Sequence, residues 1–247
     1  MIAASTGNHG QSVAYAGRLF GVRAVIGVPE GANPGKVAAM RALGAKVLFH
    51  GTDFDATREY VEHLAAEEGY RYVHSGDEPH LIAGVATYAL EILEDLPDVE
   101  TIIVPVGGGS GAAGVCTVVK NVSPNVEVIG VQAAAAPAAY KSWKARMLVE
   151  DEMETFAEGL ATRSAFSLPQ RILWQHLDDF VLVSEEELRQ AIVLMLEQTH
   201  NLAEGAGAAS LAAAVKLKER LAGRKVVIVL SGGNLSLEKL RWALAGS

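Results

Sequence analysis

Three short loops carry residue types suited to binding a small charged ligand. The first reads Ser5-Thr6-Gly7-Asn8-His9-Gly10, the second Gly107-Gly108-Gly109-Ser110-Gly111, and the third Ser231-Gly232-Gly233-Asn234. Each follows a short apolar run, at residues 2–4, 101–106 and 226–230, that predicts a buried strand. Open α/β sheets bind ligands outside the carboxyl ends of their strands, so these loops are the candidate site.

The second loop has the composition of a phosphate-binding turn. Glycines let backbone N–H groups approach a ligand without interference from a Cβ atom. The helix predicted to follow offers further free N–H groups and a positive dipole end. A tight turn that needs positive φ is the alternative, but four glycines in five positions favour phosphate binding.

The elements that must position these loops alternate along the chain. Strands are predicted at residues 24–28, 46–49, 101–106, 128–131, 180–183 and 226–230, and helices at 9–20, 36–43, 53–68, 82–93 and 237–244. Asp53 and Ser184 have the residue types of helix N-caps. This alternation predicts an α/β protein with parallel sheets and helices on both faces.

A compositional break at residues 75–80 is the best candidate boundary between two lobes. We expect a small α/β lobe at residues 2–78, which carries the first loop. A large α/β lobe at residues 79–247 carries the other two. No internal repeat or low-complexity segment is evident.

Other nucleotide-binding and catalytic motifs match less well. Gly109 to Gly114 fits G-x-G-x-x-G, but the next strand is followed by Gln132, where a dinucleotide site needs an acidic residue. A nicotinamide-binding protein therefore remains a weaker alternative. The stretch Gly31 to Lys36 resembles a P-loop, yet it is one residue short and Val37 replaces the required Ser or Thr.

The ordered set of loops resembles a known family, the fold-type-II pyridoxal-phosphate enzymes, in their serine/threonine dehydratase branch. The first loop resembles that family's asparagine loop, the second its phosphate-binding loop, and the third the segment that meets the pyridine nitrogen. Shorter stretches of the same branch follow in the right order, at residues 33–37, 42–45, 157–161 and 204–208. The resemblance covers essentially the whole chain and implies two open parallel-sheet lobes.

The resemblance also implies roles for individual residues. Gly107, Gly108, Gly109, Ser110 and Gly111 would hold the cofactor phosphate. Asn8 would bind the cofactor's phenolic oxygen, and Ser231 would face the pyridine nitrogen. Ser5, Thr6, Gly7 and His9 would surround the substrate carboxylate, and Gly159 would lie near the substrate side chain.

The resemblance also offers a less favoured prediction, a divalent-cation site at Glu204 like that of some relatives in this family. Such sites use carboxylates, carbonyls and waters, and the nearby Ser210 is a poorer ligand than a carboxylate. The histidines show no metal-ligand spacing, and the single cysteine, Cys116, is expected to be a small core residue.

One feature of the family is not recognisable. The family binds its cofactor through a lysine upstream of the asparagine loop, whereas this sequence begins immediately before that loop and its first lysine is Lys36. Lys36 matches a non-catalytic lysine of the family. We expect a truncated form of a dehydratase that is inactive by itself; the alternative is a lysine-less remnant used in ligand binding or assembly.

The expected parent activity is β-elimination from threonine or serine, which gives a 2-oxo acid and ammonia; the family also contains racemases. The expected partners are an amino-acid substrate and further copies of the chain, as a dimer or tetramer. A net charge of −8 argues against nucleic acid. No apolar run reaches membrane-spanning length and no signal peptide is evident, so a cytoplasmic location is the default expectation.

Overall fold

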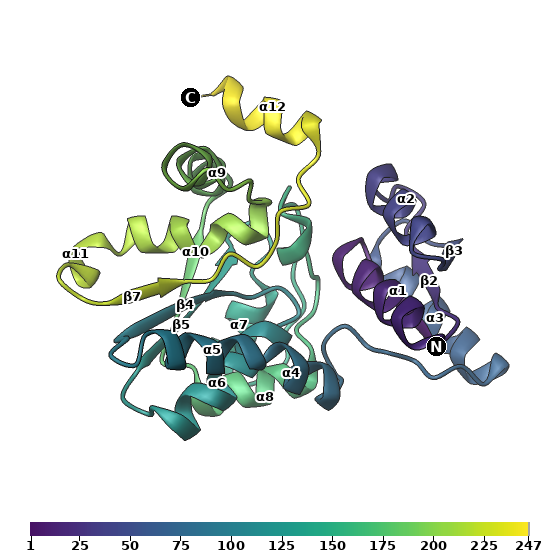
Figure 1. The fold of residues 1–247 in the computed structure, drawn as a ribbon, viewed down its shortest axis with the longest axis horizontal. Helices are drawn as coiled ribbons and strands as arrows, with labels where there is room; N and C mark the ends of the chain where they lie inside the picture. Colours follow the sequence, from purple (N-terminus) through teal and green to yellow (C-terminus); the bar gives the residue numbers. More distant parts are fainter. Residues whose placement is uncertain (247) are drawn as a thin grey trace. The chain divides into compact units, whose positions relative to one another are not determined.

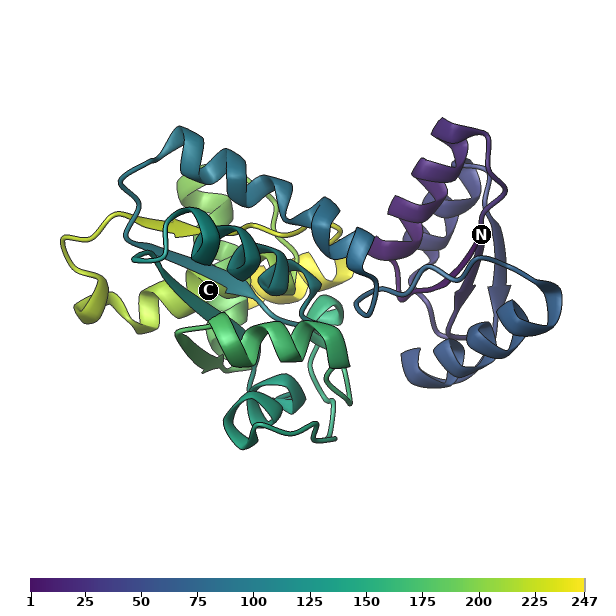
Figure 2. The ribbon, with the colours of Figure 1, turned by 90° about the horizontal axis from the view of Figure 1, so that it is seen from below.

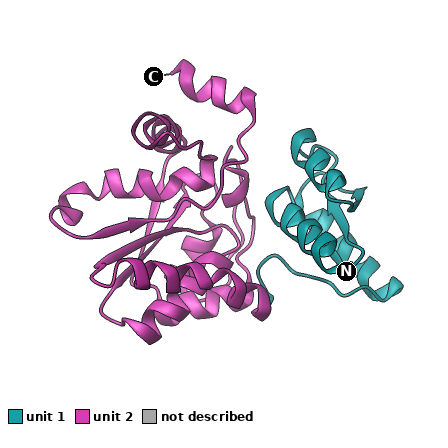
Figure 3. Ribbon diagram, in the orientation of Figure 1, with its two compact units in different colours: residues 1–78 teal, residues 79–247 magenta. Residues whose placement is uncertain are grey.

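The computed structural model describes residues 1–246. The chain forms two compact units, the first spanning Met1–Glu78 and the second beginning at Pro79 (Figure 3). Each unit has its own parallel sheet and its own hydrophobic core, and each is described by itself below.

Unit 1 is built on a three-stranded parallel sheet in the order β1-β2-β3. An isolated parallel bridge between Ile2 and Tyr72 extends the sheet beyond β1. The elements in chain order are β1 (Ile2–Ala4), α1 (Asn8–Phe20), β2 (Val25–Val28), α2 (Pro34–Ala42), β3 (Lys46–Phe49) and α3 (Phe54–Glu68).

Helices cover both faces of this sheet (Figure 1). Alternate strand residues point to opposite faces, so Ala3 and Ile26 pack with α1 and α2, whereas Ile2 and Val25 pack with α3. The predicted cap at Asp53 is present, since its carboxylate accepts a hydrogen bond from Ala56 N at 2.9 Å.

Unit 2 contains a four-stranded parallel sheet in the order β6-β5-β4-β7. Its elements are α4 (Pro79–Val85), α5 (Thr87–Asp95), β4 (Thr101–Pro105), α6 (Ser110–Val122), β5 (Glu127–Ala133), α7 (Ala138–Ala145), a 3-10 turn η1 (Glu158–Leu160), α8 (Ser167–His176), β6 (Asp179–Val183), α9 (Glu185–Thr199), α10 (Gly205–Lys216), α11 (Lys218–Leu221), β7 (Val226–Ile228) and α12 (Leu237–Ala245).

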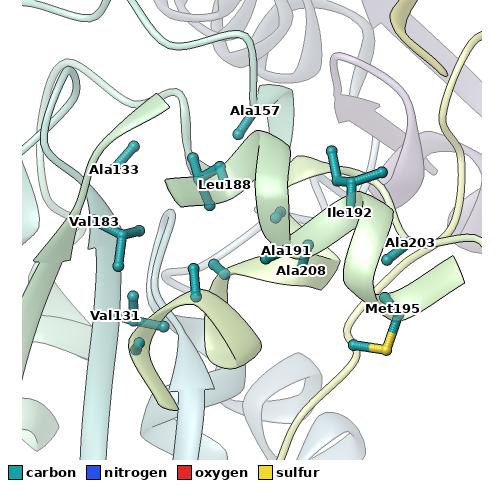
Figure 4. Packing of buried hydrophobic residues seen from close by; sticks show 14 of the residues in the cluster. Val131, Ala133, Ala157, Val183, Leu188, Ala191, Ile192, Met195, Ala203 and Ala208 are labelled. Carbon is teal, nitrogen blue, oxygen red and sulfur yellow. The ribbon is translucent and has the colours of Figure 1, made fainter. Parts of the chain in front are cut away.

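Two buried clusters sandwich this sheet, which confirms the predicted fold class. Ile103, Ile129 and Val131 pack against α9 and α10 on one face. Figure 4 shows part of this cluster, including Val131 of the sheet and Leu188 of α9. Ile102 and Val104 pack against α5, α6 and α8 on the other face. Figure 2 shows the same layers from below. Among the described helices, none is long and apolar enough to cross a bilayer.

The structure corrects several sequence-based boundaries. The single helix predicted at residues 82–93 is wrong: α4 and α5 are separate and meet at Ala86, where α6 packs so closely that a Cβ on Gly114 would lie 3.0 Å from the Ala86 backbone. The predicted strand at 226–230 ends at Ile228. Helix α10 was not predicted, because its glycines and alanines give little amphipathic pattern.

Candidate functional site

The first loop of unit 1 folds around the Ser5 hydroxyl. Ser5 is buried, and its Oγ accepts hydrogen bonds from Gly7 N at 2.9 Å and Gly10 N at 2.8 Å. The Ser5 N–H donates to Gly27 O at 3.0 Å, which fixes the loop to strand β2. Ser5 and Gly7 therefore hold the loop together, and their roles toward a substrate carboxylate stay predictions.

Lys36 covers this loop, a contact that no pattern in the sequence indicates. The Lys36 side chain is buried, and its Cδ lies 2.1 Å from where a Cβ on Gly7 would be. The lysine stem fills the space that a side chain at position 7 would take. Lys36 reaches this place because Asn33 caps α2, accepting from Gly35 N and Lys36 N.

His9 ties the loop to the following extended segment of unit 1. Its Nε2 lies 3.0 Å from Val73 O, and since a carbonyl only accepts, Nε2 must carry the proton. Burial lowers the pKa of His9, so its imidazole is neutral at neutral pH. Thr6, Asn8 and His9 are only half-buried, whereas Ser5 and Gly7 are buried, and the ligand-binding roles of all five residues stay predictions.

The second loop, in unit 2, leaves its backbone donors free. Gly109 (φ 91°) caps α6, and the first turn of that helix contains no acidic residue. From Gly107 to Ala112, no backbone N–H donates to an acceptor within residues 1–246. Free N–H groups at a helix start bind anions, so these residues fit a phosphate group.

Packing within the protein explains two of the loop's glycines. A Cβ on Gly107 would lie 2.1 Å from Gly159 O, and one on Gly108 would lie 2.3 Å from the Phe166 ring. Gly111 differs, because the nearest atom to its Cβ position is the Tyr88 hydroxyl at 3.5 Å. Close packing thus requires Gly107 and Gly108 whether or not a phosphate is bound.

Similar close contacts join η1 to the start of α10, and the start of α10 to the third loop. A Cβ on Gly159 would lie 2.8 Å from Ala206 Cβ, and one on Gly207 would lie 2.2 Å from Gly232 O. Glu204 N also donates to Gly232 O at 3.0 Å. Close contacts therefore link Gly107 to Gly159, Gly159 to the Ala206 side chain, and the start of α10 to Gly232, all within unit 2.

Sheet topology brings the second and third loops to the same edge. Strand β7 pairs in parallel with β4, with Ile228 opposite Ile103, so both loops follow the carboxyl ends of adjacent strands. Ser231 is exposed at this edge. Its predicted place at a pyridine nitrogen is compatible with this position and stays a prediction.

The divalent cation predicted at Glu204 has no support. No group of three His, Cys, Asp or Glu side chains within residues 1–246 is arranged to hold a metal ion. Glu204 is buried beside Gly159, with its Oε1 3.7 Å from the Gly159 Cβ position. Cys116 is a buried core residue, as expected, and burial raises its pKa to about 12, so its thiol is unreactive.

Comparisons with known proteins identify the family. Residues 1–232 match the family model described as "Pyridoxal-phosphate dependent enzyme". The chain is 41% identical over 241 residues to a protein named L-threonine ammonia-lyase from Thermotoga maritima. That match covers 97% of this chain and 60% of the relative, so the chain spans less than two thirds of the relative's length.

Solved structures give the same result. A structure of processed threonine deaminase isoform 2 from Solanum lycopersicum matches with a TM-score of 0.94 and 31% identity, over 99% of this chain and 72% of that one. A serine racemase from Dictyostelium discoideum matches with a TM-score of 0.87 and 31% identity, over 96% and 77% of the two chains.

Proposed function

This chain belongs to the pyridoxal-phosphate-dependent enzymes, and on that basis we propose that it carries the cofactor and substrate loops of an ammonia-lyase. The reaction would dehydrate and deaminate threonine or serine to a 2-oxo acid and ammonia. The observation that carries this proposal is the row of unpaired N–H groups from Gly107 to Ala112 at the start of α6. Relatives named for threonine deamination support the choice of substrate.

Unit 2 would hold the cofactor. When bound, pyridoxal phosphate supplies an electron sink for the negative charge that develops at the substrate α-carbon. Gly107 to Gly111 would hold its phosphate, and Ser231 would face its ring nitrogen. A neutral hydroxyl does not enforce protonation of that nitrogen, so the sink is milder, which suits loss of a β-hydroxyl better than transamination.

Unit 1 would hold the substrate carboxylate and the cofactor's phenolic oxygen. Thr6 and His9 are half-buried beside the first turn of α1, whose N–H groups favour an anion. Asn8, the first residue of α1, would bind the phenolic oxygen. Ser5 and Gly7 would act indirectly, by fixing the backbone that carries these residues.

We further propose that the 247-residue chain by itself turns over serine and threonine negligibly. A lysine that bonds covalently to the cofactor must be desolvated and close to it. Of the chain's nine lysines only Lys36 is buried, and its stem is packed across Gly7. Without such a lysine the protein loses both the covalent attachment and a general base, and the base alone typically contributes about 10²–10⁴-fold.

Two assays test this proposal. Titration with pyridoxal phosphate should show weak binding, and borohydride reduction followed by peptide mapping should reveal no stoichiometric lysine adduct. An ammonia-release assay should show activity only in a version extended upstream by a lysine-bearing segment. A stoichiometric adduct on Lys36 would overturn the proposed inactivity. An extended, folded, cofactor-bound version without turnover would favour a binding or assembly role instead.

Assembly into a dimer or tetramer and a cytoplasmic location stay predictions. Both rest on the resemblance to the family alone. Sedimentation of the purified chain would measure the first directly.

A further inference from the structure

Helix α12, at the C-terminal end of the chain (Figure 1), packs against α9, and side-chain hydrogen bonds hold it at both ends. At its C-terminal end, the Arg189 guanidinium donates to Ala243 O at 2.7 Å and Gly246 O at 2.8 Å. A cation at this end also matches the helix dipole. Glu186 holds Arg189 in place through two further hydrogen bonds, of 2.7 and 2.6 Å.

At its N-terminal end, α12 contacts the segment that leads into η1. Lys239 Nζ donates to Phe156 O at 2.9 Å and to Glu158 Oε1 at 2.6 Å. The Trp242 ring packs edge-on against the Phe156 ring, with 4.6 Å between centroids. A lysine in the first turn of a helix opposes the helix dipole, so the Glu158 carboxylate compensates an unfavourable position.

The backbone of Phe156 is held from two helices. Its N–H donates to Glu185 Oε2 at 2.9 Å, at the start of α9, and its C=O accepts from Lys239. Three residues after Phe156, Gly159 O lies against Gly107, the first glycine of the phosphate-binding loop. The contacts therefore run from α12 through Phe156–Gly159 to Gly107.

We propose that Lys239 is a positioning residue for the cofactor loop. It fixes the Phe156–Glu158 backbone, and the Gly159 carbonyl then holds Gly107 in the conformation that leaves the following N–H groups free. The proposal rests on the proposed cofactor role of Gly107–Gly111. Both side chains of the Lys239–Glu158 pair are 31% exposed, so the effect is modest.

The test compares K239M with a matched control, K216M. Lys216 likewise donates to one carbonyl, Leu182 O at 3.0 Å, and to one carboxylate, Glu187, but it lies on the far part of α10. Hydrogen exchange without added cofactor should follow Leu160 and Ala161, whose N–H groups donate to Ala157 O and Glu158 O. We expect exchange there to be about 3- to 10-fold faster in K239M, as the loss of one partly exposed ion pair and one hydrogen bond implies.

Titration with pyridoxal phosphate forms the second arm. The dissociation constant of K239M should rise by about threefold, while K239R and K216M should match the wild type. Unchanged exchange at Leu160 and Ala161 in K239M, or an equal change in K216M, would overturn the proposal. A wild-type chain that fails to bind pyridoxal phosphate would instead refute the proposed function, and the exchange result would still decide whether Lys239 fixes η1.

Discussion

The first loop in unit 1 and the second loop in unit 2 have the same local architecture but are stabilised differently. Each connects a buried parallel strand to a helix of 13 residues. In unit 1 side chains fix the loop: the Ser5 hydroxyl accepts two backbone N–H groups, and the Lys36 stem covers Gly7. In unit 2 backbone contacts fix it, chiefly Gly159 O against Gly107.

This difference decides which groups remain for a ligand. The Ser5 hydroxyl accepts hydrogen bonds from two of the first loop's N–H groups, so fewer backbone donors of that loop remain for the ligand that we propose there. The second loop consumes none of the donors from Gly107 to Ala112. A loop held by backbone contacts thus suits a phosphate, whereas a loop held by side chains suits a smaller group that side chains also recognise.

The largest effect should come from placing the same methyl group in both loops. In G107A the new Cβ would lie 2.1 Å from the Gly159 carbonyl, which belongs to a packed backbone, so we expect a loss of about 3 kcal/mol in unfolding free energy. In G7A the new Cβ meets only the flexible Lys36 stem, also at 2.1 Å, and the loss should be smaller.

Urea unfolding checks this difference. All three tryptophans, Trp143, Trp174 and Trp242, lie in unit 2, so their fluorescence follows G107A, while hydrogen exchange of unit 1 peptides follows G7A. G111A is the matched control, since its nearest neighbour at 3.5 Å is an ordinary contact. Equal losses in G107A and G111A would contradict the backbone-contact account.

A smaller effect should follow removal of the Ser5 hydroxyl. S5A leaves Gly7 N and Gly10 N buried without their acceptor, and an unsatisfied buried donor costs about 1–3 kcal/mol. We expect a loss of about 2 kcal/mol in unit 1, since both N–H groups share one oxygen. S12A removes an exposed hydroxyl on α1, the helix that follows the first loop, and should change little. If S5A behaved like S12A, the loop would not depend on its side chains.

The sequence predicted most strands and the identity of the three loops, because buried parallel strands are continuous apolar runs and glycine clusters are conspicuous. It did not predict why the glycines are needed. Gly107 and Gly159 are 52 positions apart in sequence, and nothing local indicates that one faces the other's carbonyl. The packing of the Phe166 ring against Gly108 and the ion pair between Lys239 and Glu158 likewise depend on tertiary structure. Lys36 was matched to a non-catalytic lysine of the family, and nothing in the sequence indicated that its stem packs on Gly7.

The smallest effect concerns pH and should be confined to unit 1. Burial lowers the pKa of both His9 and His74 below the ordinary histidine value of 6.5. Each imidazole is held in its neutral form: His9 Nε2 donates to Val73 O, while His74 Nδ1 accepts from Gly76 N at 2.9 Å and Asp77 N at 2.8 Å. Protonation of His74 would remove that acceptor.

The sign of the effect follows from proton binding in the two states. Below about pH 6.5 the unfolded chain binds protons at these positions before the folded chain does, so the stability of unit 1 is complete above that pH and falls as the pH drops toward the lowered folded pKa values. We expect unit 1 peptides to exchange with increasing ease between pH 7.5 and 5.5, after correction for intrinsic exchange rates. H9Q keeps a donor for Val73 O but cannot titrate, so it should weaken this dependence. A pH profile of H9Q identical to that of the wild type would show that His9 does not contribute to it, and would leave the first loop dependent on Ser5 and Lys36 alone.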